Sequence, residues 1–391
     1  MNPATASDRL ASGEPPLGPV GQIPPEIACA RDYETLARRF MALPSYEYVA
    51  GGSGLDLTVA ANLSAFAQLA LYPRLLRDVG AGHTATTING ERFAHPIFLA
   101  PVAFQNLAHA GGELETARAA NATDTCLVAS TLSSCRLEDV ARAAGPRRWF
   151  QLYFQPRRED TLDLLERAAQ AGYGAIVVTL DATIQAASLR ALRAGFRMPA
   201  DCTAANLRDH PPAARVELKA GDSRIFQGVM KGAPTWRDLE WLLAETTLPV
   251  WVKGVLHPDD ARALQQFGVA GLVVSNHGGR GLDGAIATLD ALPAIRAAVG
   301  AGFPLLLDGG IRSGADVFKA LALGADAVMI GRLQMYALSV AGALGVAHMV
   351  TLLREEFEVC MALTGCATVA DIKPGALARV SPISRESSPP C

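Results

Sequence analysis

The stretch Gly271–Gly284, GLVVSNHGGRGLDG, decides how the rest of the chain is interpreted. Its apolar run Leu272–Val274 is typical of a strand buried on both faces of a parallel sheet. His277 follows directly, so an imidazole stands at the carboxyl end of the strand, where a neutral base or acid is useful. Two glycines then permit unusual backbone angles, and Arg280 adds a planar guanidinium suited to a carboxylate. A surface turn and an arginine paired to a surface acid explain the same residues, so the rest of the chain must decide.

Outward from this stretch, short apolar runs alternate with segments of helical periodicity. The runs are 97–100, 126–129, 149–153, 175–180, 250–253, 272–275, 305–308 and 327–330. The helical segments between most of them are 112–121, 136–144, 159–171, 258–267, 288–299 and 314–323. Strands that alternate with helices predict an α/β fold with a parallel sheet. Eight strands is the number that closes a (β/α)8 TIM barrel.

The segments outside this alternation complete the predicted domain organisation. We expect helices over 24–41, around 46–52 and over 54–69, and a hairpin over 85–93 with Asn-Gly at its turn. A last helix is expected over 340–364. Residues 1–25 read as a disordered N-terminal tail, 26–375 as one barrel domain, and 376–391 as a loose C-terminal tail.

The alternation is interrupted after the fourth strand, between about 182 and 235. This connection is rich in Pro, Gly and Asp and has few apolar runs. So long a connection is uncommon in a compact domain unless it has a role. We therefore expect a mobile lid here.

Composition excludes several classes of function. With 391 residues and 50% hydrophobic residues, the chain can bury a large core. Its net charge of −3 gives no electrostatic footprint for nucleic acid. The seven cysteines are scattered, odd in number and without a CxxC pair, which favours a reducing, cytoplasmic location. We see no signal peptide and no run of about 18 uncharged apolar residues, and we expect no membrane span and no metal site.

Every predicted strand end carries polar or backbone-permissive residues. In order, the ends give Pro101, Val102 and Ala103; Ser130; Gln151 and Tyr153; Thr179 and Asp181; Lys253; His277 and Arg280; Asp308, Gly309, Gly310 and Arg312; Gly331 and Arg332. Each has an ordinary explanation by itself: Thr179 as a satisfied strand hydroxyl, Tyr153 as a core aromatic, Lys253 as a surface charge. Because a barrel carries its chemistry at the carboxyl ends of its strands, the full set predicts an active site.

The last two strand ends predict a cofactor that bears a phosphate. Gly-Gly-Ile-Arg after the seventh strand and Gly-Arg after the eighth expose backbone N–H groups and bring two guanidinium groups. Asp308 suits a ribityl or ribose hydroxyl. Lys253 has no obvious partner in the sequence and would favour negative charge on the cofactor. Ser130, Gln151 and Thr179 offer hydroxyl and amide groups to the edge of a flat heterocycle.

The motifs SNHGGRGLDG and LDGGIRSGADVFKALALGADAVMIGR, with APVAFQ, FQLY, VVTLD and VKGV in order, resemble one family over roughly residues 33–370. It is the FMN-dependent α-hydroxy-acid oxidase and dehydrogenase family, which includes glycolate oxidase, lactate oxidase and mandelate dehydrogenase. The resemblance implies an FMN cofactor lying across the barrel mouth.

The resemblance also implies roles for single residues. His277 would be the base, with Asp181 stabilising its imidazolium. Arg280 and Tyr48 would hold the substrate carboxylate, and Tyr153 would bind or orient the substrate hydroxyl. The residues implied to contact the flavin ring are Pro101, Val102, Ala103, Ser130, Gln151, Thr179, Lys253 and Ser275. Those implied to hold ribityl and phosphate are Asp308, Gly309, Gly310, Arg312, Gly331 and Arg332.

The substrate side departs from the family pattern. Ser188 stands where the family usually has a second substrate arginine, so either Arg190 or Arg193 replaces it from a shifted loop, or the substrate is not a simple small 2-hydroxy acid. Leu132 stands where an aromatic residue is common. Val102 replaces the usual Thr, Leu333 the usual Pro and Gly281 the usual Gln. Ala103 is the residue that members acting as oxidases tend to have.

The implied activity is oxidation of a 2-hydroxy acid, or a related α-hydroxy or α-amino carbonyl compound, to the 2-oxo product. We expect an (S)-2-hydroxy-acid oxidase-like enzyme with O2 as acceptor and H2O2 as product. A dehydrogenase with another electron acceptor, a flavin-dependent isomerase and a non-catalytic flavoprotein are the alternatives. By resemblance alone, the protein is expected to be a homo-oligomer, a tetramer.

Overall fold

The eight predicted strands form a closed parallel barrel in the computed structural model, which describes residues 16–212 and 216–380. Around the barrel the strands follow the order β10, β11, β4, β5, β6, β7, β8, β9. Their bounds are β4 Ile97–Leu99, β5 Leu127–Ser130, β6 Arg148–Leu152, β7 Ile176–Thr179, β8 Val250–Val255, β9 Gly271–Val274, β10 Leu305–Asp308 and β11 Ala327–Ile330. The TIM-barrel prediction is confirmed.

Burial on both faces explains why these strands are continuous apolar runs rather than alternating ones. On β4, Phe98 points into the barrel interior, while Ile97 and Leu99 join the core between the strands and the helices. Trp149 and Trp251 fill the interior with ring centroids 4.9 Å apart. Successive side chains on a strand point to opposite faces, so one strand supplies both cores.

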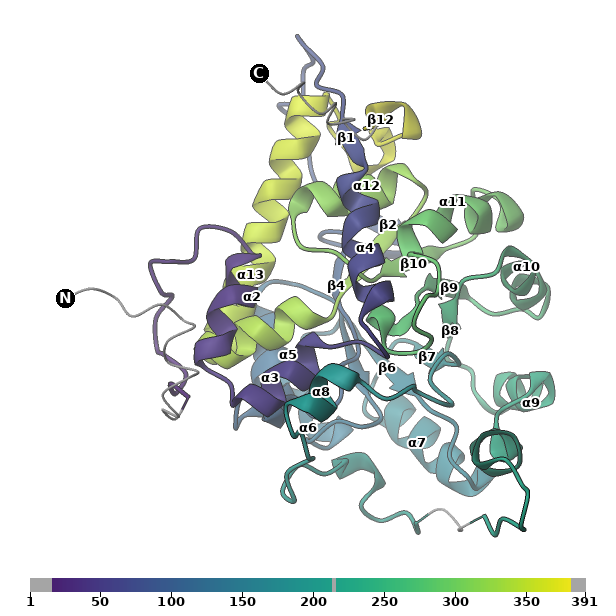
Figure 1. The fold of residues 1–391 in the computed structure, drawn as a ribbon. Helices are drawn as coiled ribbons and strands as arrows, with labels where there is room; N and C mark the ends of the chain where they lie inside the picture. The colour runs from purple at the N-terminus through teal and green to yellow at the C-terminus, as the bar shows by residue number, and fades with distance from the viewer. Residues whose placement is uncertain (1–15, 213–215, 381–391) are drawn as a thin grey trace, which may run out of the picture.

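Helices surround the barrel, as Figure 1 shows. Their bounds are α5 Gly112–Ala122, α6 Leu137–Ala143, α7 Arg158–Gln170, α9 Trp236–Glu245, α10 Pro258–Gln266, α11 Thr288–Val299, α12 Gly314–Ala322 and α13 Arg332–Thr364. The predicted hairpin is β2 Thr86–Ile88 with β3 Glu91–Phe93. Its Phe93 ring packs 4.7 Å from Phe98, so the hairpin covers the amino end of the barrel and leaves the carboxyl end for the site.

The N-terminal segment differs from the prediction. In place of one helix over 24–41 there is a short α2 Asp32–Leu36 and a 3-10 turn Ala37–Arg39. Helices α3 Leu43–Ala50 and α4 Leu57–Ala67 follow. The predicted tail over 1–25 is too long, since the Leu17 N–H donates to the Arg39 carbonyl and the Val20 N–H to the Val340 carbonyl, both at 2.8 Å. Residues 1–15 lie outside the described part.

The C-terminal prediction also needs correction. Strand β12 Leu377–Arg379 pairs antiparallel with β1 Leu69–Leu71, so the ordered chain extends past the predicted boundary at 375. Residues 381–391 are outside the described part. Helix α13 begins at Arg332, eight residues before the predicted start, and contains a kink at Ala341 and Gly342.

By length and composition alone, helix α13 is long and apolar enough to cross a membrane, although no such helix was expected from the sequence. Its most apolar window is 67% buried within the protein. The helix packs against α2, α5 and α12, and burial in that core accounts for its composition.

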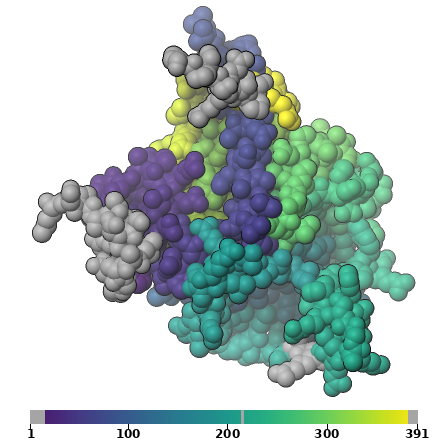
Figure 2. All heavy atoms as spheres, in the orientation of Figure 1, coloured from purple at the N-terminus to yellow at the C-terminus, as the bar shows by residue number. Residues whose placement is uncertain are grey.

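The predicted lid, 182–235, contains α8 Leu189–Arg193, short 3-10 and π-helical turns, and no strand in its described residues. Residues 213–215 are not described. Figures 1 and 2 show α8 beside the N-terminal helix α3, at the mouth of the barrel. The lid therefore borders the site through α8.

Candidate active site

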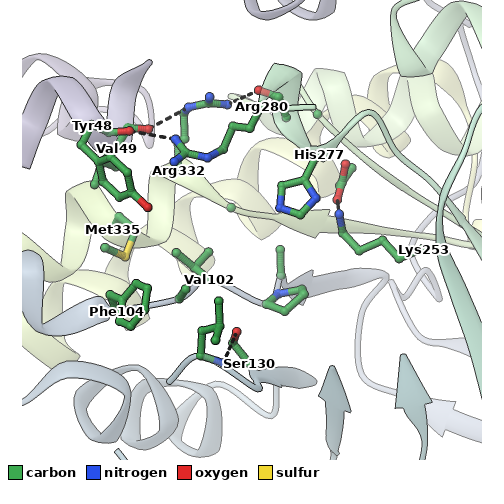
Figure 3. Close-up of a pocket in the computed structure, with 18 of the residues that line it drawn as sticks. Tyr48, Val49, Val102, Phe104, Ser130, Lys253, His277, Arg280, Arg332 and Met335 are labelled. Atoms are coloured by element: carbon green, nitrogen blue, oxygen red, sulfur yellow. Dashed lines mark hydrogen bonds and ion pairs between the residues drawn. The ribbon is translucent and has the colours of Figure 1, made fainter. Parts of the chain in front are cut away.

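A cavity at the carboxyl end of the barrel brings most of the predicted residues together (Figure 3). Its predicted lining residues are Tyr48, Pro101, Val102, Ala103, Ser130, Tyr153, Lys253, His277, Arg280, Asp308, Gly309, Gly310, Arg312, Gly331 and Arg332. Gln151, Thr179, Asp181 and Ser275 stand next to this lining: Gln151, Asp181 and Ser275 bond to Ser130, His277 and Lys253, and Thr179 ends β7 beside Lys253.

His277 and Asp181 form a partly buried pair. The His277 Nδ1 lies 2.8 Å from Asp181 Oδ1, and the His277 side chain is 18% exposed. Burial by itself would raise the pKa of Asp181, but Lys253 and the hydrogen bond with His277 outweigh it, so the pKa is lowered. The carboxylate is therefore ionised and oriented toward Nδ1. This leaves Nε2 of the imidazole for a proton from a bound molecule.

The loop after β9 presents this histidine through an unusual backbone. His277, Gly278 and Gly279 have φ values of 57°, 61° and 78°, in the left-handed region. Histidine tolerates that region better than most residues other than glycine, and the two glycines adopt it freely. The His277 N–H donates to Ser275 Oγ at 3.0 Å, which fixes the turn. The sequence pattern at 275–280 is thus explained by the turn it forms.

Arg280 and Tyr48 lie together at one side of the cavity. Arg280 Nη1 donates to the Tyr48 carbonyl at 2.8 Å and the Gly51 carbonyl at 3.1 Å. The Arg280 Cζ lies 4.7 Å from the centre of the Tyr48 ring. Across the cavity, burial raises the pKa of Tyr153 to about 12, so its hydroxyl remains a donor. One guanidinium and two phenols therefore line the same cavity as His277.

Lys253 has a partner that the sequence did not reveal. Its Nζ lies 3.1 Å from Asp308 Oδ2 and donates to Ser275 Oγ at 2.8 Å, and Ser275 Oγ donates to Asp308 Oδ1 at 2.7 Å. Burial alone would lower the pKa of Lys253, but the carboxylates of Asp308 and Asp181 outweigh it and raise the pKa. Lys253 is therefore a fixed positive charge at the cavity wall.

The backbone after β10 and β11 fits the predicted phosphate site, but one of its two arginines is already paired. Gly309 and Gly310 have φ values of 95° and 89°, and a Cβ on Gly310 would lie 2.5 Å from the Asn62 carbonyl oxygen. Gly331 stands at the N-terminus of the 33-residue α13, where free N–H groups favour an anion. Arg312, however, donates from Nε to Glu34 Oε2 at 2.8 Å and from Nη1 to the Ile311 carbonyl at 3.0 Å. Several of its guanidinium N–H groups are therefore already hydrogen-bonded within the protein.

Arg332 lines the cavity and is held by backbone carbonyl groups. It donates to the carbonyls of Val49, Gly278 and Gly51 at 3.0, 2.8 and 2.8 Å. Burial lowers the pKa of Arg332 to about 10, which still leaves it positively charged at neutral pH. This charge lies beside the N-terminus of α13, so the cavity retains an anion-binding end.

Two buried polar atoms support a bound heterocycle. Gln151 Nε2 and Thr179 Oγ1 have no hydrogen-bond partner among the described residues, although both side chains are buried. The Ser130 Oγ donates to Gln151 Oε1 at 3.2 Å, which turns the amide N–H groups away from Ser130. A buried polar group without a partner is costly. The polar edge of an isoalloxazine would satisfy them, so the residues present fit FMN.

The structure also decides how Ser188 and the lid arginines are used. Ser188 Oγ accepts the Ala191 N–H at 3.3 Å and caps α8. Arg190 pairs with Glu47 and lies 3.6 Å from Asp56, and neither Arg190 nor Arg193 lines the cavity. The suggestion that one of them replaces the missing family arginine is therefore wrong for this structure.

Several cavity residues were not predicted as binding residues. These are Val49, Ala100, Phe104, Leu107, Leu132, Gln185, Gly278 and Met335. Leu132 was noted only as a departure from the family. Six of the eight are apolar, so no chemical signal separated them from core residues. Among the described residues of the lid, only Gln185 lines the cavity, and it contributes a neutral amide rather than a charge.

The closed barrel carries three features at its mouth: the His277–Asp181 pair, Arg280 beside Tyr48, and buried polar atoms that fit a flavin. Together they indicate a flavin-dependent oxidoreductase. A family model described as FMN-dependent dehydrogenase matches residues 37–379. The chain belongs to this FMN-dependent family.

Relatives and solved structures agree with this assignment. A protein of Alicycliphilus denitrificans named L-lactate oxidase is 65% identical over 91% of this chain and 98% of its own length. A 4-hydroxymandelate oxidase of Amycolatopsis orientalis is 44% identical over 86% of this chain and 94% of its own. The crystal structure of a mandelate oxidase with (S)-2-phenylpropionate superposes with a TM-score of 0.81 at 42% identity, covering 90% of this chain and 98% of that one.

Proposed function

We propose that the protein is an FMN-dependent oxidase that converts an (S)-2-hydroxy acid and O2 into the 2-oxo acid and H2O2. The observation that carries the proposal is the His277–Asp181 pair, which faces the same cavity as Arg280, Tyr48 and Tyr153. An isomerase or an inactive flavoprotein does not need this arrangement. The names of the relatives support oxygen as the acceptor, as does Ala103 beside the flavin site.

The residues divide the chemistry among them. Bound FMN would accept the two electrons that leave the substrate. Arg280 and Tyr48 hold the carboxylate, because a guanidinium beside a phenol gives charge-assisted hydrogen bonds. His277 Nε2 takes a proton from the substrate, and Asp181 stabilises the resulting imidazolium. Tyr153 donates to the substrate oxygen, and Lys253 supplies positive charge near the polar edge where negative charge develops.

We propose L-lactate as the first substrate to test. The proposal rests on the 65% identical relative, which is named L-lactate oxidase. It also rests on the cavity, where Arg312 pairs with Glu34 and Arg332 donates to three backbone carbonyls, which leaves Arg280 as the guanidinium for a substrate. Among the described lid residues, the lining takes only Gln185. A substrate with one carboxylate needs no second guanidinium beyond that of Arg280.

Anaerobic mixing tests the activity. The FMN-loaded protein is mixed with L-lactate, D-lactate, glycolate and mandelate, and the loss of the flavin absorption band is followed. Bleaching by L-lactate but not D-lactate, followed by H2O2 formation on admission of air, is the expected result. Absence of bleaching with every acid, while FMN stays bound, would rule out the proposed oxidase. Bleaching without H2O2 would indicate a dehydrogenase with another acceptor.

We also propose a homotetramer in the cytoplasm. The tetramer is proposed from family resemblance. The cytoplasmic location is supported by the described cysteines, which are all free thiols. Light scattering of the purified protein and fractionation of the producing cells test the two statements separately.

A further inference from the structure

One aromatic side chain of the lid contacts the substrate clamp, which is the pair Tyr48 and Arg280 proposed to hold the carboxylate. Phe196, three residues past α8, stacks on the Tyr48 ring with centroids 4.2 Å apart and an interplanar angle of 13°. The Arg280 Cζ also lies over the Tyr48 ring, 4.7 Å from its centre. A guanidinium and a phenyl ring at these distances cannot share one face of the ring. Tyr48 is therefore held between Phe196 on one face and Arg280 on the other.

The backbone fixes where Phe196 stands. Helix α8 ends in a left-handed glycine, Gly195, with φ 70°. The Gly195 N–H donates to the Leu192 carbonyl and the Phe196 N–H to the Ala191 carbonyl, both at 3.0 Å. This is the Schellman pattern, which sets the direction of the residue after the glycine. The position of Phe196 is thus determined by the position of α8.

Two further contacts attach α8 to the segment that carries Tyr48. Arg190 pairs with Glu47, the residue before Tyr48, and Glu47 is 8% exposed. The Gly54 N–H donates to the Ala187 carbonyl at 3.0 Å, just before the helix. Arg193, on the same short helix, has no ion pair with any described residue. Helix α8 is therefore attached to the segment that carries Tyr48, whereas residues 202–210 of the lid bond to other parts of the barrel rim, at Asn106, Ser133 and Asp163.

We propose that Phe196 is a positioning residue for substrate binding, which holds Tyr48 against Arg280 so that the lid governs the affinity of the clamp. The inference rests on the proposed function of the clamp. Phe196 itself does not line the cavity, so it acts through Tyr48. When α8 moves away, Tyr48 loses one of its two stacking partners and the carboxylate site loosens. Loss of this contact should therefore weaken ligand binding and leave the rate of proton abstraction by His277 unchanged.

The test separates binding from chemistry. Variants Phe196→Ala, Phe196→Leu and Phe196→Tyr are made, with Arg193→Met as the matched control on α8. The dissociation constant of the 2-oxo product, pyruvate, is read from its perturbation of the flavin spectrum, together with KM and the limiting rate of flavin reduction. Since an aromatic pair contributes modestly, we expect Phe196→Ala to weaken pyruvate binding and raise KM by about 3- to 10-fold. The limiting rate should change by less than about twofold, and Phe196→Tyr and Arg193→Met should match the parent.

Two backgrounds make the inference falsifiable even if folding is affected. In Tyr48→Phe the ring remains, so Phe196→Leu should still weaken pyruvate binding; in Tyr48→Leu the same change should have no further effect. An equal effect in both backgrounds would overturn the proposal, as would a fall in the limiting rate with unchanged KM. Pyruvate binding is read without turnover. A protein that binds pyruvate in this pattern but oxidises no acid would therefore refute the oxidase proposal and leave the positioning role standing.

Discussion

Replacing Asp181 by Asn tests the central pair of the site most directly. The carboxylate Oδ1 lies 2.8 Å from His277 Nδ1, and its other oxygen has no partner among the described residues. An amide oxygen can still accept the Nδ1 proton, so the ring keeps its orientation, but the charge that stabilises an imidazolium is lost. Hydrogen bonds to charged groups contribute about 1.5–3 kcal/mol, against about 1 kcal/mol for neutral ones. The difference of about 0.5–2 kcal/mol predicts a limiting rate of flavin reduction that is lower by roughly 2- to 30-fold.

The assay is anaerobic stopped-flow reduction with the substrate identified above, with FMN content measured beside it. Asp163→Asn is the matched control, because Asp163 also pairs with a histidine, His210, at 2.9 Å but lies outside the cavity. We expect the control to reduce its flavin at the parent rate. If Asp181→Asn did the same with FMN fully bound, the assignment of Asp181 as the stabilising charge would be refuted.

Three further predictions concern cofactor binding and stability. Glu34→Gln removes the carboxylate that pairs with Arg312 and should lower the free energy of unfolding by about 1 kcal/mol at pH 7. Burial alone would raise the pKa of Glu34, but the pairing with Arg312 outweighs it and lowers the pKa. The stability that the ion pair contributes is therefore present above the ordinary pKa of 4.5 and is lost as pH falls through the lower folded value. The melting temperatures of parent and variant should accordingly converge in acid. Gly310→Ala introduces a Cβ 2.5 Å from a carbonyl oxygen at positive φ and should cost more stability than Gly300→Ala, which is also at positive φ but in open space. Equal melting temperatures of the two variants would contradict the close approach. Gln151→Leu removes an amide whose Nε2 has no partner among the described residues, and should raise the dissociation constant of FMN by roughly 5- to 100-fold in equilibrium dialysis. An unchanged value would remove Gln151 from the cofactor site.

The barrel and the strand-end residues were predictable because both depend on local sequence. Each strand is a short apolar run, and its polar end follows in the next few residues, so the position of His277 or Asp308 at the mouth comes from one segment at a time. The lining of the cavity by His277 and Arg280 was anticipated in this way, whereas the role of Tyr48, on α3, was implied only by the family resemblance.

What escaped prediction were partners from distant segments. Lys253 and Asp308 stand 55 positions apart, and Arg312 and Glu34 278 apart, so neither ion pair leaves a pattern in the sequence. The start of α13 was hidden because Gly331-Arg332 was read as a loop that binds phosphate, whereas Arg332 is also the first residue of the helix. Strand β12 has only three residues and depends on pairing with β1.

The site also draws its parts from both ends of the chain, which has a consequence for its biosynthesis. Arg332 binds the carbonyls of Val49 and Gly51, 283 and 281 positions away, and Arg312 binds Glu34. A ribosome releases the chain from its N-terminus, so Tyr48 and α3 emerge long before the residues that enclose them. Closing loops of this length is entropically costly and slow. A nascent chain halted before residue 332 would therefore have a nearly complete set of strands but no finished mouth, and cofactor capture should begin only when α13 has left the ribosome.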